Sequence, residues 1–156
     1  MDTVYLETSI IGYLTSRPSR DLLVAAHQQI THEWWELHRA SYELFVSEAV
    51  VAECSAGDSQ AAQERLDRLS GLPILDVSEA AERLAEDLLR GIPLPDKANI
   101  DALHMALATV SGIDYVLTWN CTHIANAALQ HKIEAVCRSA GYNPPIICTP
   151  EQLMEG

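Results

Sequence analysis

Short apolar runs alternate with longer amphipathic segments along the chain. The short runs have the length and composition of buried strands, and they lie at 4–6, 42–47, 72–78, 114–119 and 144–150. The longer segments carry apolar residues at steps of three and four, which predicts helices at 21–40, 48–54, 59–71, 79–90, 100–112 and 123–141. Strands that alternate with helices favour right-handed crossovers and a mainly parallel sheet covered on both faces. We therefore expect an α/β fold with three α/β/α layers.

Length and composition indicate one domain over residues 1–156, rich enough in apolar residues to bury a core, with 48% hydrophobic and 21% charged residues. No window offers the roughly 20 apolar residues of a membrane span, and the N-terminus lacks the pattern of a signal peptide. The four cysteines are widely spaced without a C-x-x-C pair, which favours reduced thiols in a cytoplasm. The net charge of −12 disfavours bulk electrostatic binding of nucleic acid but suits cations or a basic protein partner.

Acidic and amide side chains fall where the strands of such a sheet end. Glu7 follows the first strand, and Asn120 follows the strand at 114–119. Glu53 lies in the helix after the second strand, and Asp101 lies near the start of the helix after the Pro-rich break. Ligands of open α/β sheets bind beyond the carboxyl ends of the strands. Four oxygen donors gathered there would hold Mg²⁺ or Mn²⁺, and without a cation the three carboxylates would repel one another.

Each of these residues also has an ordinary structural alternative. Asp101 suits the dipole at a helix start, and Asn120 after a strand is typical of a turn. Glu53 is also compatible with a partly exposed helix position. Glu7 is the hardest to explain without a function, because a carboxylate at the end of a core strand is costly to bury. The four residues together, in this order, indicate a functional site more specifically than any one of them does.

The residues around these positions resemble the PIN domains, and among them the VapC-type toxins of bacterial toxin–antitoxin pairs. The resemblance rests on four motifs in order along nearly the whole chain, "VYLETSIIGYL", "LFVSEAVVAEC", "DALHMALA" and "YVLTWNCTHI". The sequence departs from the family pattern at two sites, with Glu7 where the family has Asp and Asn120 where many members have Asp.

The resemblance implies a metal-dependent endoribonuclease that cuts single-stranded RNA without a covalent intermediate. Glu7, Asp101 and Asn120 would hold the principal Mg²⁺ or Mn²⁺, and Glu53 would bind a second ion or orient the attacking water. Thr8, Ser9 and Thr118 would donate hydrogen bonds to these ligands or to phosphate, or would be ordinary hydroxyls at strand ends. His123 would add a ligand or contact a phosphate, or would be a capping or surface histidine. The resemblance further implies a cytoplasmic homodimer neutralised by an antitoxin protein.

Several residues leave more than one interpretation open. Arg17 and Arg20, in a loop near the end of the first strand, would grip the substrate or simply be solvated. Trp34 and Trp35 point about 100° apart on a helix, so one is expected in the core, and an exposed one would suit base stacking or an interface.

Two rival functions also follow from the sequence. The departures at Glu7 and Asn120 allow a PIN-like binding module that has lost productive metal. A hydrolase of small phosphate esters is less favoured, because the chain has no Asp-x-Asp nucleophile motif and no Gly-rich phosphate loop.

Overall fold

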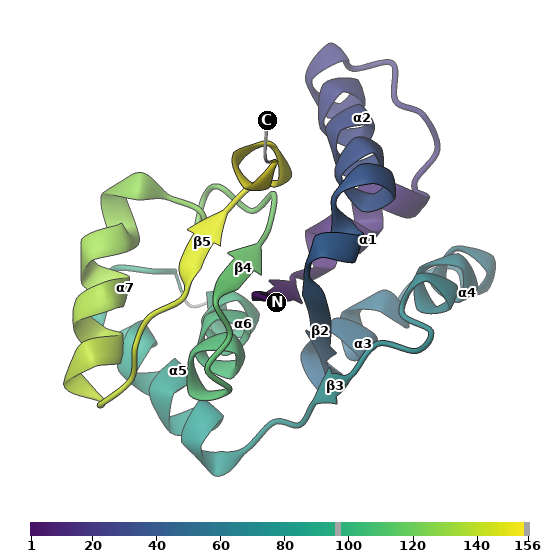
Figure 1. Cartoon of the computed structure of the whole chain (residues 1–156). Helices are drawn as coiled ribbons and strands as arrows, with labels where there is room; N and C mark the ends of the chain where they lie inside the picture. Colours follow the sequence, from purple (N-terminus) through teal and green to yellow (C-terminus); the bar gives the residue numbers. More distant parts are fainter. Residues whose placement is uncertain (96–97, 155–156) are drawn as a thin grey trace.

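The computed structural model describes residues 1–95 and 98–154, and it contains a five-stranded sheet with helices on both sides (Figure 1). The strands are β1 (Thr3–Leu6), β2 (Glu43–Ser47), β3 (Ile74–Leu75), β4 (Tyr115–Leu117) and β5 (Ile146–Cys148). The α-helices are α1 (Thr8–Thr15), α2 (Leu22–Leu37), α3 (Glu48–Cys54), α4 (Ser59–Arg68), α5 (Glu79–Gly91), α6 (Asn99–Val110) and α7 (Ala127–Ser139). Short 3₁₀ helices lie at η1 (Arg39–Ser41) and η3 (Pro150–Leu153).

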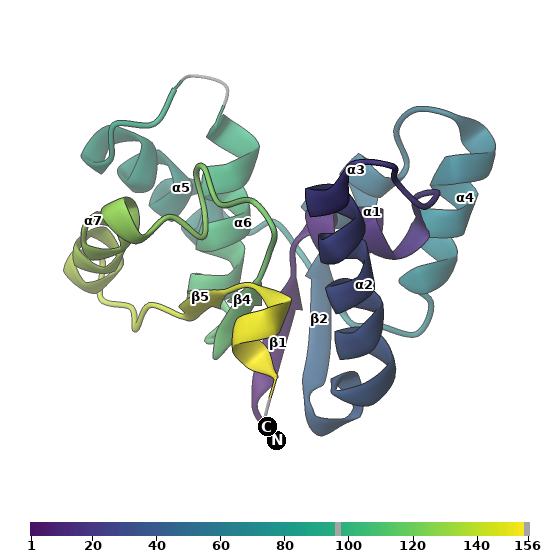
Figure 2. The ribbon, with the colours of Figure 1, turned by 90° about the horizontal axis from the view of Figure 1, so that it is seen from above.

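The strand order is β3-β2-β1-β4-β5, and every neighbouring pair is parallel. The chain leaves β1 toward β2 and β3, and later returns to the other side of β1 with β4 and β5. Helices α1 to α4 gather on one side of the sheet and α5 to α7 on the other (Figure 2). This arrangement confirms the predicted α/β fold with a mainly parallel sheet. It also places the reversal in strand order between β1 and β4, whose carboxyl ends flank the crevice where such folds bind ligands.

The core is built on β1, which is the central strand of the sheet. Val4, Tyr5 and Leu6 are fully buried, as their apolar run predicts. Val4 pairs with Leu44 of β2 on one side and with Tyr115 of β4 on the other. Because β1 is hydrogen-bonded on both edges and covered on both faces, the residue that follows it has a fixed position at the centre of the sheet's carboxyl edge.

The structure differs from the sequence prediction by one additional helix and by the ends of several elements. Helix α1 was not predicted, although its buried residues Ile10, Ile11 and Leu14 share one face of the helix. Helix α7 begins at Ala127 rather than at 123, because the Asn126 side chain accepts a hydrogen bond from Ala128 N and caps the helix there. The strand predicted at 144–150 is shorter in the structure, where β5 spans Ile146–Cys148 and the chain forms η3 from Pro150 onward.

Both adjacent tryptophans pack within the protein. Trp34 is fully buried and Trp35 is 5% exposed, with the Arg39 guanidinium 4.0 Å above the Trp35 ring. Neither ring therefore offers an open face for base stacking. The four cysteines are free thiols, as predicted from their spacing, and only one of them is exposed. None of the helices in the described part of the chain is long and apolar enough to cross a membrane.

Candidate functional site

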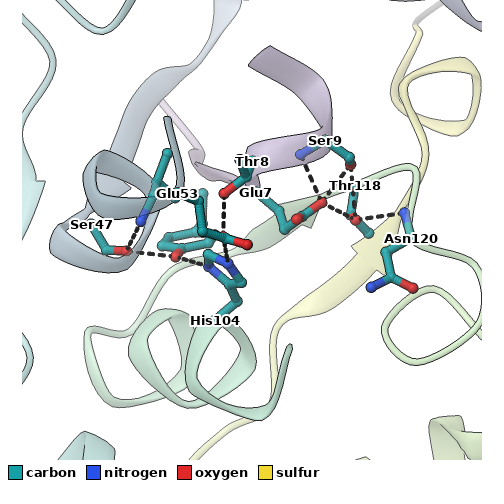
Figure 3. A network of polar contacts seen from close by, with 10 residues as sticks. Glu7, Thr8, Ser9, Ser47, Glu53, His104, Thr118 and Asn120 are labelled. Atoms are coloured by element: carbon teal, nitrogen blue, oxygen red, sulfur yellow. Dashed lines mark hydrogen bonds and ion pairs between the residues drawn. The ribbon is translucent and has the colours of Figure 1, made fainter. Parts of the chain in front are cut away.

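Glu7 lies directly after β1 and forms the N-cap of α1. Its backbone N–H donates to the Leu117 carbonyl at 3.1 Å, so the ends of β1 and β4 are tied together. Its side chain is 5% exposed, and Oε1 accepts hydrogen bonds from Ser9 N at 3.2 Å, from Ser9 Oγ, and from Thr118 Oγ1 at 2.6 Å (Figure 3). Donors from both strand ends therefore hold this carboxylate in one orientation, while a supporting role of Ser9 and Thr118 toward a bound metal stays a prediction.

Glu53 lies in the last turn of α3, and its carboxylate faces the same region (Figure 3). Its Oε1 accepts hydrogen bonds from Thr8 Oγ1 and from His104 Nε2, each at 2.5 Å. Burial opposes ionisation of this carboxyl group, but the hydrogen bonds from His104 and Thr8 and the charge of His104 outweigh it, so the pKa of Glu53 is lowered. The side chain therefore acts as an anionic acceptor at neutral pH.

His104, which was not predicted as a site residue, lies on α6 and is fully buried. Its Nδ1 lies 2.6 Å from the Tyr5 hydroxyl, which is itself 2.8 Å from Ser47 Oγ. Burial raises the pKa of Tyr5 far above its ordinary value, so this hydroxyl stays protonated. The sequence did contain a signal for His104, because it follows Asp101 by three residues and so shares a face of the helix with it.

The carboxylates of Glu7 and Glu53 and the imidazole of His104 form a compact group. One ligand atom from each lies within 4.8 Å of the other two. Every hydrogen bond that described residues donate to these two carboxylates is accepted by Oε1. Each Oε2 is therefore available for another partner. Carboxylate oxygens are the ligands that Mg²⁺ and Mn²⁺ prefer. The donor set at the carboxyl ends of the central strands thus fits a hard divalent cation.

Asp101 is not part of this group of three, and Asn120 is connected to it through Thr118, whose hydroxyl accepts from Asn120 N at 2.9 Å and donates to Glu7. Asp101 Oδ2 is 2.7 Å from His123 Nδ1, and both side chains are partly exposed. Asn120 Oδ1 accepts from the backbone N–H groups of Thr122 and His123 at 3.2 and 3.1 Å, and so it shapes the turn after β4. The structure therefore brings Glu7 and Glu53 together directly, while metal binding by all four predicted ligands stays a prediction. His123 contacts Asp101, and its role as a supporting residue also stays a prediction.

Arg17 and Arg20 lie exposed in the loop between α1 and α2. The Arg17 carbonyl accepts a hydrogen bond from Gln28 Nε2 at 2.8 Å, which fixes the backbone of the loop. Arg17 also lines a cleft of about 270 Å³ between α1 and α4. In the same cleft Arg65 donates to the carbonyls of Cys54 and Ala56, so its guanidinium is already engaged. Substrate binding by the two loop arginines stays a prediction.

Comparison with known proteins gives one family and two solved structures. The family model described as PIN domain matches residues 4–120. The structure of VapBC2 from Rickettsia felis, bound to a DNA fragment from their promoter, superposes with a TM-score of 0.60 at 18% identity, covering 94% of this chain and 98% of that one. VapC20 of Mycobacterium tuberculosis, a sarcin-ricin loop cleaving toxin, gives a TM-score of 0.59 at 18% identity, covering 89% and 95%. At this identity the two likenesses establish the fold. No curated protein sequence matches the chain.

Proposed function

Because the chain belongs to the PIN domain family, we propose that it is a metal-dependent endoribonuclease that cleaves single-stranded RNA, acting as the toxin of a toxin–antitoxin pair. One observation carries the proposal: Glu7 and Glu53, far apart in sequence, converge beside His104 at the reversal in strand order. Ligand binding in open α/β folds is concentrated at this position.

The residues divide the chemical work between binding and orientation. Glu7 and Glu53 would hold the cation through their free Oε2 atoms, with Asp101 and Asn120 completing the ligand set. When bound, the cation activates water as a nucleophile and offsets charge on the phosphate and leaving oxygen. Ser9 and Thr118 fix the Glu7 carboxylate by hydrogen bonds, and Thr8 fixes that of Glu53.

The polar residues around the ligands have two further roles in this proposal. His123 orients Asp101 through the contact at 2.7 Å. Arg17 and Arg20 contact the RNA backbone from their loop, and they supply positive charge that the acidic cluster lacks. The overall charge of −12 is compatible with this function, because a cation held by the acidic residues, rather than a basic surface, would face the scissile phosphate.

The same charge supports the proposed partner. A protein of net charge −12 attracts a basic protein, and an antitoxin with a basic segment would fit both the acidic surface and the acidic site. The fold shared with VapBC2 and VapC20 supports a partner of this class. We extend the proposal to a homodimer in the cytoplasm, where the RNA substrate and the reduced thiols would be found.

The decisive experiment is cleavage of a mixed single-stranded RNA pool in Mg²⁺, in Mn²⁺ and in EDTA. Glu53→Gln removes the charge of one ligand, and Glu48→Gln makes the same change at an exposed position on the same helix. We expect cleavage that requires metal, a loss of at least about 100-fold in Glu53→Gln, and no loss in Glu48→Gln. Asp101→Asn tests in the same assay whether that residue belongs to the ligand set.

Three results would each contradict a different part of the proposal, namely the metal dependence, the nuclease activity and the RNA substrate. Cleavage that persists in EDTA at the same rate would show that the cluster does not act through a cation. Folded wild-type protein that is inert in both metals, with circular dichroism as the check on folding, would favour the PIN-like binding module instead. Activity on small phosphate esters but not on RNA would identify a different hydrolase.

A further inference from the structure

Four polar side chains form a continuous chain from the core to the acidic cluster. Ser47 Oγ lies 2.8 Å from the Tyr5 hydroxyl, the hydroxyl lies 2.6 Å from His104 Nδ1, and His104 Nε2 lies 2.5 Å from Glu53 Oε1 (Figure 3). Ser47, Tyr5 and His104 are completely buried, whereas the Glu53 side chain is 39% exposed. The chain of contacts therefore begins in the core and ends on the only one of these four groups that reaches solvent.

The surroundings of His104 distinguish it from a metal ligand. Nε2 donates its hydrogen to the Glu53 carboxylate, which has no proton of its own to offer, and Nδ1 is engaged with Tyr5. Both nitrogens are thus occupied, so neither has a lone pair directed at a cation. The Tyr5 ring packs against the imidazole edge at a centroid distance of 5.8 Å, which fixes the imidazole plane.

The contacts also join the three elements that carry the acidic residues. Tyr5 lies on β1, which leads into Glu7, and His104 lies on α6, which begins beside Asp101. Ser47 caps α3 by accepting a hydrogen bond from Val50 N at 3.3 Å, and α3 carries Glu53. A shift of any one element would break a hydrogen bond between groups that are buried from water, which costs more than breaking an exposed one.

We propose that His104 is a positioning residue, which, together with Tyr5, holds the Glu53 carboxylate in place for a divalent cation. The inference rests on the proposed function, because it assigns His104 a role toward the cation of that site. Removing a side chain that orients a metal ligand typically weakens metal affinity by about 10- to 100-fold. His104 is such a partner because it donates a hydrogen bond to Glu53, and Tyr5 acts indirectly because it contacts His104.

The test measures Mn²⁺ binding by isothermal titration calorimetry. The variants are His104→Leu, which removes the donor, and His104→Gln, which keeps an N–H group able to reach Glu53. Tyr5→Phe removes the hydroxyl behind the imidazole, and Met105→Leu alters the next buried residue of α6 without touching the cluster. We expect His104→Leu to weaken Mn²⁺ binding about 10- to 100-fold, His104→Gln to restore most of the affinity, and Tyr5→Phe to fall between them. Met105→Leu should bind as the wild type does.

A second readout needs no metal. In EDTA, denaturant unfolding of His104→Leu, Glu53→Gln and the double variant forms a thermodynamic cycle. We expect the two substitutions to be coupled, because each removes the partner of the other. Cooperative unfolding of His104→Leu in the same titration establishes that the variant is folded, so that a loss of Mn²⁺ affinity reports on the site.

Three outcomes overturn the inference, and they are distinguishable. If the wild type binds Mn²⁺ and His104→Leu binds it equally well, the positioning role is refuted but the proposed function is not. A greater loss for Zn²⁺ than for Mn²⁺ in both His104 variants would identify the imidazole as a direct ligand, because Zn²⁺ prefers nitrogen donors. Failure of the wild type itself to bind Mn²⁺ rejects the proposed function, and the role of His104 toward a cation with it.

Discussion

Thr118→Val replaces a hydroxyl by a methyl group of similar volume at a residue that is fully buried after β4. In the wild type this hydroxyl donates to Glu7 Oε1 at 2.6 Å and accepts from Asn120 N at 2.9 Å. The substitution therefore leaves a buried carboxylate with one donor fewer and a backbone N–H without its acceptor. We expect it to destabilise the protein, even in the absence of any metal.

The magnitude follows from those two hydrogen bonds. A hydrogen bond to a charged group contributes about 1.5–3 kcal/mol, and a part-buried N–H left without a partner adds roughly 1 kcal/mol. We expect the free energy of unfolding to fall by about 3 kcal/mol. For a chain of this size each kcal/mol corresponds to about 2–4 °C in Tm, so the midpoint should drop by about 9 °C.

The assay is thermal and urea unfolding in EDTA, with Thr109→Val as the matched control. Thr109 is also buried, but its hydroxyl bonds only to the Met105 carbonyl one turn earlier and makes a long contact with Cys137. That carbonyl keeps its place in the helix, so the control should lose less than about 1 kcal/mol. If Thr118→Val is no less stable than Thr109→Val, then Thr118 does not support the Glu7 carboxylate and the reasoning fails.

Three further predictions concern the rest of the molecule. Iodoacetamide should modify Cys121 alone in the native protein, because the other cysteines are buried. Mass spectrometry counts the adducts, and more than one adduct on the folded protein would contradict this prediction. Burial raises the pKa values of Cys54 and Cys148 from 9.0 to about 11. The thiols therefore ionise at lower pH in the unfolded chain than in the folded one, and the free energy of unfolding should fall as the pH rises from 9 to 11. The fall should be smaller in Cys54→Ala. An equal fall in the variant would show that the Cys54 thiol does not cause the pH dependence. Ser78→Ala should cost about 1 kcal/mol in urea unfolding, because the Ser78 side chain caps α5 by accepting from Ala81 N at 3.1 Å, and an unchanged midpoint would show that the cap contributes nothing.

The elements that the sequence predicts well are those whose signal is local. The apolar run of β1 and the three- and four-residue spacing of apolar positions in α5 are each set within a few residues, so the pattern alone places these elements. Glu7 stands out as a candidate ligand for the same reason, since a carboxylate directly after a buried strand is unusual in itself. Helix α1 escaped because its eight residues are few and include β-branched residues and Gly12, which favour other structures.

The network behind the acidic cluster could not be predicted, because it depends on pairings across the sheet. Tyr5 lies in an apolar run and looks like an ordinary core residue. Nothing near it in the sequence indicates that its hydroxyl contacts His104, 99 residues later. The pairing of His123 with Asp101 likewise depends on the turn after β4. Motifs locate the residues of a site along the chain, whereas the partners that orient them are fixed by tertiary packing.

The bond between Glu7 and Thr118 also bears on synthesis of the protein, because it joins residues separated by 111 positions. Chains grow at about 5–20 residues per second, so roughly 5 to 20 s pass between translation of Glu7 and translation of Thr118, which donates to it. Until β4 has left the ribosome, β1 has no neighbour on that edge, and the crevice cannot form. The nascent chain therefore lacks the Thr118 donor that fixes the Glu7 carboxylate for most of translation, and a product truncated before β4 never acquires it.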